Sequence, residues 1–257
     1  MSSTLVSNIA ELVTNSNPDL GIINNAALVI EDGKVVWVGS TKSAPAADSS
    51  IDAHGGTVTP GFVDSHTHAV FAGDRSGDYL ARMSGGSYLS AGINTTVQST
   101  RNASIEELRT HTRRLVEQAR HSGTTTLEIK SGYGLDIATE KKILTVAREF
   151  TTETTFLGAH VVPKDAKSRD EYVSLVKGEM LDACVDLAKW IDVFCDSSAF
   201  TVDEARDILK TGMAKGLRGR IHGNQLGDTG GADLAAELNL ASVDHCTHVS
   251  DKTLHAL

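Results

Sequence analysis

Two histidines with a single residue between them, His66 and His68, end the segment PGFVDSHTH at residues 60–68. Because successive side chains of a strand alternate between its two faces, both imidazoles project from the same face and can bind one ion. His222, at the end of the run LRGRIH at 217–222, would supply a third nitrogen. Three protein nitrogens and a water molecule form an open catalytic site for zinc or a similar transition ion. Such an ion lowers the pKa of its bound water towards about 7 and polarises a carbonyl oxygen, so the pattern indicates hydrolysis.

The apolar runs before these histidines belong to a series of short candidate strands. The candidates lie at 61–67, 124–130, 154–160, 189–195, 217–222 and 241–246. Polar residues able to do chemistry gather at their carboxyl ends, namely His66, His68, Lys130, His160, Asp196, His222 and His245. Capping-box spacing predicts helix starts between the strands, at Ser104 with Glu107, Ser168 with Glu171 and Thr201 with Glu204. Strands that alternate with helices predict a parallel sheet.

The placement of the polar residues favours a barrel over a doubly wound sheet. A dinucleotide-binding sheet would need G-x-G-x-x-G, and a triphosphate site would need G-x-x-x-x-G-K-[ST]; neither string occurs. Barrel enzymes build their active sites at the carboxyl ends of the strands, where these histidines lie. We therefore predict an α/β fold with a (β/α)8 barrel over residues 59–257, incomplete at about six βα units. Residues 1–58 form a separate small β-unit, with a hairpin around Asp32-Gly33.

Composition limits the classes of partner. The chain of 257 residues carries a net charge of −9, which argues against a nucleic-acid or anionic-membrane surface and favours a small-molecule substrate. Cys184, Cys195 and Cys246 show no C-x-x-C spacing and lie in or beside apolar runs, so we expect reduced core residues. No signal peptide or membrane-spanning stretch is recognisable, and the predicted location is cytoplasmic.

Five separated motifs carry a family resemblance. In chain order they are VTPGFVDSHTHAVFAGDR, EIKSGYGL, LGAHVVP, RIHGNQL and GGADLAAEL with SVDHCTH. Together they resemble the imidazolonepropionase family of the amidohydrolase superfamily, from about residue 8 to the last residue. The resemblance implies hydrolysis of 4-imidazolone-5-propanoate to N-formimidoyl-L-glutamate in L-histidine degradation. It also implies an amidohydrolase-type TIM barrel beside a small β-sandwich, and one divalent or trivalent metal ion, zinc or iron.

The resemblance assigns residues to metal and substrate. It makes His66, His68 and His222 the metal ligands. It makes substrate contacts of Arg75, Tyr133, His160, Gln225 and Tyr88. The guanidinium of Arg75 suits a carboxylate or a ring carbonyl.

Acid–base chemistry falls to His245 in this sequence. Some family members have Glu where Gln225 stands, and a glutamine orients substrate but cannot transfer a proton. His245 ends a candidate strand and titrates near neutral pH, so it is the predicted catalytic base, with Gln225 assisting. His248 is the alternative, although a loop or capping role suits it better. Lys130, a carbamylated metal bridge in some amidohydrolases, is predicted to be structural.

The sequence departs from the family pattern at its end. Ser250 is expected to cap a helix that stops at Leu257, two βα units short of a closed barrel. The family's strand-eight Asp, a metal ligand, is missing from the sequence. Three interpretations stay open: a piece of the hydrolase, a catalytically incomplete metal-binding protein, or another cyclic amidase or aminohydrolase of the superfamily. The oligomeric state is also open, with a homodimer as one option.

Overall fold

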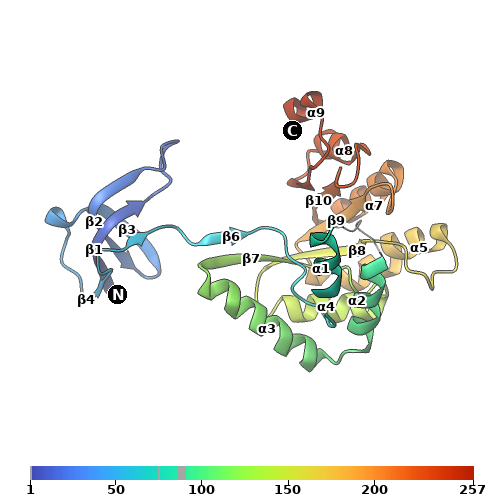
Figure 1. The fold of residues 1–257 in the computed structure, drawn as a ribbon, viewed down its shortest axis with the longest axis horizontal. Coiled ribbons are helices and arrows are strands. Elements are labelled where there is room, and N and C mark those ends of the chain that lie inside the picture. Colours follow the sequence, from blue (N-terminus) through green and yellow to red (C-terminus); the bar gives the residue numbers. More distant parts are fainter. Residues whose placement is uncertain (1, 75, 86–90) are drawn as a thin grey trace. The chain divides into compact units, whose positions relative to one another are not determined.

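The computed structural model of the chain describes residues 2–74, 76–85 and 91–257 (Figure 1). It contains two compact units, Met1–Phe62 and Val63–Leu257. The boundary predicted near residue 58, between a small β-domain and a barrel domain, stays a prediction. Within the described residues, no helix is both long and apolar enough to cross a membrane.

The first unit is built on one sheet of five strands. They are β1 (Ser3–Val13), β2 (Ile22–Glu31), β3 (Lys34–Ser40), β4 (Ser49–Asp52) and β5 (Thr57–Val58). The sheet order is β3-β2-β1-β4, with β5 also paired to β1, and a 3-10 turn, η1 (Thr41–Ser43), follows β3. The predicted hairpin is confirmed, since β2 and β3 pair antiparallel around Asp32 (φ 49°) and Gly33 (φ 75°), the two positive angles that a two-residue turn requires. The predicted β-sandwich stays a prediction.

The second sheet contains all six predicted strands. They are β6 (Phe62–Asp64), β7 (Thr124–Lys130), β8 (Glu153–Ala159), β9 (Trp190–Cys195), β10 (Arg218–Gly223) and β11 (Ser242–His245). The sheet order is β11-β10-β9-β8-β7-β6, and the pairings from β7 to β11 are parallel. The α/β class is therefore confirmed, whereas the number of βα units and the closure of a barrel stay predictions.

Helices join these strands. They are α1 (Ser76–Met83), α2 (Ala91–Asn102), α3 (Ile105–His121), α4 (Ile137–Ala147), α5 (Arg169–Leu175), α6 (Leu181–Cys184), α7 (Val202–Ala214), α8 (Gly231–Leu238) and α9 (Asp251–Ala256), with the short turns η2 (Val176–Met180) and η3 (Val185–Leu187) beside α6. Both reciprocal hydrogen bonds of the predicted capping boxes form at Ser104 with Glu107 and at Thr201 with Glu204. The hydroxyls of Ser168 and Ser250 cap α5 and α9. Local sequence thus decides where these helices begin.

The sheet of the second unit is curled, and the curl brings its two edges together. β6 and β11 are its opposite edges, yet Nδ1 of His66, just after β6, lies 2.9 Å from Oδ2 of Asp244 in β11. Nη1 of Arg220 in β10 also donates to the carbonyl of Ser65, at 3.3 Å. A flat parallel sheet would hold its edges several strand spacings of about 4.8 Å apart. The carboxyl ends of all six strands therefore face a common mouth.

Candidate active site

Three imidazoles meet at this mouth. The ring centroids of His66 and His222 are 4.5 Å apart, and that of His245 lies 5.2 Å from His66 and 5.1 Å from His222. One nitrogen of each lies within 4.8 Å of the other two, close enough for a single ion. His66 follows β6, His222 lies in β10 and His245 ends β11. The strands therefore bring together side chains that lie far apart in the sequence.

His68 lies beside this trio rather than in it. Its ring centroid is 5.4 Å from that of His66 and 5.7 Å from that of His222, and the ring stacks on His160 at 5.0 Å. Among the described residues, the three imidazoles whose nitrogens all lie within 4.8 Å of one another are His66, His222 and His245, and His68 belongs to no such group of three. The predicted ligand set of His66, His68 and His222 stays a prediction.

Carboxylates lie behind two of the imidazoles. Nδ1 of His66 hydrogen-bonds Oδ2 of Asp244 at 2.9 Å. Nδ1 of His222 lies 3.0 Å from Oδ2 of Asp192, a close contact without the alignment of a hydrogen bond. A carboxylate at Nδ1 fixes the ring so that Nε2 offers its lone pair to a metal, as in many carboxylate–histidine–metal arrangements. Neither carboxylate was predicted from the sequence. An aspartate inside an apolar run such as WIDVFC is unusual, however, and indicates a buried carboxylate with a partner.

Lys130 links these carboxylates. Its Nζ lies 2.8 Å from Oδ2 of Asp192, 3.2 Å from Oδ2 of Asp244 and 3.0 Å from Oε1 of Glu128, and its side chain is fully buried. Burial opposes the charge of Lys130, but Asp192, Glu128 and Asp244 outweigh it and raise the pKa of the ammonium. The ammonium therefore holds the acidic partners of His66 and His222 in place, in agreement with the structural role predicted for Lys130.

The surrounding histidines are held neutral. Burial, with a further contribution from His222, lowers the pKa of His160 to about 3. His245 is an exposed residue, but partial enclosure of its ring and the neighbouring His222 lower its pKa to about 4, below the near-neutral value expected from the sequence. Burial likewise lowers the pKa of His68 well below its usual range. A neutral imidazole keeps a lone pair for a metal or a proton, which both metal binding and base catalysis require.

The nitrogens of the site fit a transition metal. His222 is 3 % exposed, and its Nε2 has no hydrogen-bond partner within the described residues; Nδ1 of His68 is likewise buried and unpaired there. Buried polar atoms are rarely left unpaired, and a coordinated ion would satisfy these nitrogens. Zinc and iron both accept imidazole ligands, so the donor set suits either ion.

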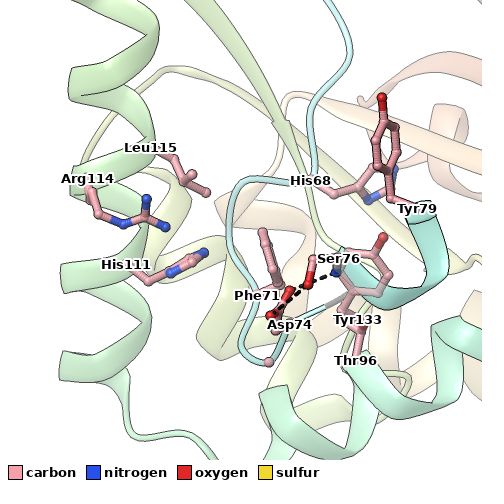
Figure 2. A pocket seen from close by; sticks show the side chains of 11 residues that line it. His68, Phe71, Asp74, Ser76, Tyr79, Thr96, His111, Arg114, Leu115 and Tyr133 are labelled. Atoms are coloured by element: carbon pink, nitrogen blue, oxygen red, sulfur yellow. Dashed lines mark hydrogen bonds between the residues drawn. The ribbon is translucent and has the colours of Figure 1, made fainter. Parts of the chain in front are cut away.

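A pocket of about 520 Å³ opens beside His68 (Figure 2). Tyr133 lines it, with its ring centroid 5.2 Å from that of His68 and 5.4 Å from that of His160. On the opposite side, His111 and Arg114 of α3 line the same pocket. Tyr133, predicted from the sequence, therefore lies where a small molecule could reach both it and His68.

The remaining predicted residues occupy different surroundings. His160 is 6 % exposed, with Nδ1 2.9 Å from the carbonyl oxygen of Gly132. Gln225 follows β10, and its backbone N donates to Oδ2 of Asp196 at 3.0 Å. His248 is an exposed loop residue before α9. Two predicted contacts, Arg75 and Tyr88, lie outside the described residues.

The chain matches curated proteins along its whole length, although no family model matches it. It is 53% identical over 262 residues to an imidazolonepropionase of Mycolicibacterium smegmatis, covering 100% of this chain and 66% of that protein. It is 54% identical over 261 residues to the imidazolonepropionase of Salinispora arenicola, covering 67% of that protein. A Streptomyces coelicolor imidazolonepropionase is 52% identical over 262 residues. The chain spans about two thirds of the length of these relatives.

Solved structures share the fold at low identity. A guanine deaminase from C. acetobutylicum superposes with a TM-score of 0.63 at 14% identity, covering 99% of this chain and 65% of that one. An amidohydrolase gives 0.62 at 16% identity, covering 98% and 63%. Molinate hydrolase gives 0.59 at 15% identity, covering 99% and 61%. The curled sheet is therefore part of an amidohydrolase-type fold.

Proposed function

This chain belongs to the imidazolonepropionase family, and we propose that the whole protein hydrolyses the cyclic amide C–N bond of 4-imidazolone-5-propanoate. The product would be N-formimidoyl-L-glutamate, in the degradation of L-histidine. The observation that carries this proposal is the convergence of His66, His222 and His245 within 4.8 Å at the carboxyl ends of the parallel strands, in a chain about half identical to imidazolonepropionases.

The proposed metal ligands are His66, His68 and His222, with one zinc or iron ion. Metal dependence fits the amidohydrolase-type fold and the clustered His and Asp side chains. The chemistry supplied by the bound ion is activation of water and polarisation of the ring carbonyl. Asp244 and Lys130 support this role by holding the Nδ1 side of His66, which leaves its Nε2 for coordination.

His245 is the proposed base. As a neutral imidazole it accepts the proton of the attacking water, whose oxygen bonds to the ring carbonyl carbon. It then returns the proton to the ring nitrogen as the C–N bond breaks, so that the reaction adds one water molecule. Its ring centroid is 5.1 Å from that of His222, which keeps it within reach of the same small volume.

The proposed substrate contacts supply different polar groups. His160 engages Gly132 through Nδ1, which leaves Nε2 for the substrate, and Tyr133 offers a hydroxyl. Gln225 can orient the substrate through its amide without transferring a proton. Arg75 would bind the propanoate carboxylate with its guanidinium, and Tyr88 completes the proposed set.

The test is turnover by the full-length protein. We expect loss of 4-imidazolone-5-propanoate absorbance with the wild type, and a rise in KM of about tenfold to hundredfold for Arg75→Ala, the scale of a lost hydrogen bond to a charged group. Absence of turnover by the wild type would overturn the proposed function. Turnover that Arg75→Ala leaves unchanged would remove only the role of Arg75.

A small-molecule substrate is the partner that fits an enzyme family of this kind. The predicted absence of nucleic-acid and membrane partners, the cytoplasmic location and the homodimer stay predictions.

A further inference from the structure

A buried carboxylate of helix α4 holds the loop that carries Tyr133. The loop, residues 131–135, connects β7 to α4. Oε2 of Glu140 accepts a hydrogen bond from the backbone N of Gly132 at 2.9 Å. Its Oε1 accepts from the backbone N of Gly134 at 2.7 Å and of Leu135 at 2.8 Å. The two oxygens therefore bind the backbone on both sides of Tyr133.

This carboxylate does something other than cap its own helix. Asp136 already fills the N-cap position of α4, accepting from the backbone N of Thr139 at 2.7 Å. Glu140 is fully buried, and burying a carboxylate is unfavourable unless its oxygens are paired. Its backbone donors, Gly132, Gly134 and Leu135, all belong to the loop, so the loop amides compensate for the burial of the carboxylate.

The loop has a shape that needs this support. Gly132 has φ +106°, and a Cβ there would meet Nδ1 of His160 at 3.0 Å. A Cβ on Gly134 would meet Oε1 of Glu140 at 2.9 Å and its backbone N at 2.7 Å. Leu135, which is not a glycine, has φ +56°. Such backbone angles persist only where the surroundings impose them.

Helix α2 holds the loop from its carbonyl side. Nε of Arg101 donates to the carbonyl of Gly134 at 2.7 Å, and Nη2 donates to that of Leu135 at 3.2 Å. Nη1 of Arg101 pairs with Oδ2 of Asp165 at 2.7 Å, which fixes the guanidinium. Glu140 thus binds the amides and Arg101 the carbonyls of the same short segment.

We infer that Glu140 is a positioning residue that sets Tyr133 and His160 for the substrate. It acts through Gly132, whose amide binds Glu140 and whose carbonyl lies 2.9 Å from Nδ1 of His160. The rings of Tyr133 and His160 are consequently held 5.4 Å apart between centroids. This inference rests on the proposed function, because Tyr133 and His160 are its proposed substrate contacts.

The test compares Glu140→Gln with Thr154→Val in the full-length protein. Gln keeps the size of Glu but offers one acceptor oxygen to three amides. Thr154, 3 % exposed at the amino end of β8, donates its hydroxyl to the carbonyl of Leu187 at 2.8 Å rather than to residues 131–135, so its replacement also leaves a partly buried polar group unpaired without removing a hydrogen bond of the loop. We expect kcat/KM to fall about 10- to 100-fold in Glu140→Gln and to stay near wild type in Thr154→Val.

A double-mutant cycle with Tyr133→Phe distinguishes positioning from general destabilisation. If Glu140 acts through the loop, its substitution lowers kcat/KM much less in the Tyr133→Phe background than in the wild type. The effect of Thr154→Val is the same in both backgrounds. Equal effects of Glu140→Gln in both backgrounds, or an effect no larger than that of Thr154→Val, would overturn the inference.

Two further measurements keep the outcome clear. Arg101→Met releases the carbonyl side of the loop, and it replaces Glu140→Gln in the double-mutant cycle if Glu140→Gln does not fold. Its effect on kcat/KM should likewise be much smaller in the Tyr133→Phe background than in the wild type. Hydrogen exchange of residues 131–135 reports the loop without any substrate: protection falls in Glu140→Gln and not in Thr154→Val. If the wild type does not turn over 4-imidazolone-5-propanoate but Glu140→Gln still shows this loss of protection, the proposed function is refuted and the role of Glu140 in holding the loop is supported. Unchanged protection in Glu140→Gln would refute that role.

Discussion

The central strands and the edge strands of the larger sheet carry different halves of the site. β9 is buried at every residue and β8 at six of seven, whereas β6 is exposed throughout and β11 has no buried residue. Lys130, Asp192 and His222, on central strands, are at most 3 % exposed. His66 is half-buried and His245 is exposed. The site residues on the central strands are therefore held by packing, whereas those on the edge strands are held by polar contacts.

The two regions differ in which interactions set stability and which set chemistry. In the centre, an ammonium and two carboxylates are fully enclosed, so their charges depend on one another. At the edges, the hydrogen bond between His66 and Asp244 joins the two ends of the sheet. Substitution of the buried ammonium and carboxylates in the centre should act on folding, whereas substitution of the histidines and of Asp244 should act mainly on metal binding and turnover.

The largest effect is expected for Lys130→Met. The substitution leaves Glu128, Asp192 and Asp244 around an apolar side chain, and removing one partner of a buried ion pair typically destabilises a protein by about 3–5 kcal/mol. Denaturant unfolding of the full-length protein measures the loss. The control is Lys189→Met, which removes a half-exposed pair with Glu153 and should change stability by less than about 1 kcal/mol. Similar losses for the two variants would contradict the account of the centre.

His245→Ala should separate chemistry from folding. Because the side chain is exposed, the free energy of unfolding should change little, while kcat falls by about 10²- to 10⁴-fold through loss of the base. Turnover and denaturant unfolding are measured on the same preparation. A variant that keeps wild-type kcat would show that another residue acts as the base. The kcat of His248→Ala then tests the alternative.

Asp244→Asn and Asp192→Asn compare the edge and the centre directly. Loss of a carboxylate behind a metal-binding histidine typically weakens metal affinity by about 10- to 100-fold, so both variants should lose affinity in competition with a chelator. Only Asp192→Asn should also lower stability substantially, since the Asp192 side chain is fully buried and accepts a hydrogen bond from Lys130 at 2.8 Å, whereas Asp244 lies 3.2 Å from Lys130 and is partly exposed. Unchanged metal affinity in Asp244→Asn would show that its contact with His66 has no part in the site.

The smallest effect is expected for the ion pair between Arg169 and Glu204 at the surface. The hydrogen bond from Arg169, aided by the amide and hydroxyl of Thr201, lowers the pKa of Glu204 to about 2. Because the folded pKa is depressed, the stabilisation is complete above the unfolded value of about 4.5 and is lost as the pH falls towards 2. The advantage of wild type over Glu204→Gln should be below about 1 kcal/mol at pH 7 and shrink below pH 4.5. Thermal unfolding at pH 7 and pH 3 checks it, and a difference that grows in acid would reverse the assigned sign.

Local signals explain what the sequence could predict. Strand positions follow from apolar runs, and the capping boxes at Ser104 and Thr201 follow from residues three apart. The contacts that organise the site are not local: Lys130 and Asp192 are 62 positions apart, and His66 and Asp244 are 178 apart. No spacing rule pairs such residues, because the strand order brings Lys130 near Asp192 and the curl of the sheet brings His66 near Asp244. Glu140 was missed for a related reason, since its partners are backbone amides that carry no sequence signal.

We propose above all that the imidazoles at the strand ends bind a catalytic metal ion. It is tested most directly by the metal content of the purified full-length protein, measured by mass spectrometry beside His222→Ala. We expect about one zinc or iron ion per chain in the wild type and less than about a tenth of that in His222→Ala. A wild-type protein without metal, or a His222→Ala variant that keeps its full content, would contradict it.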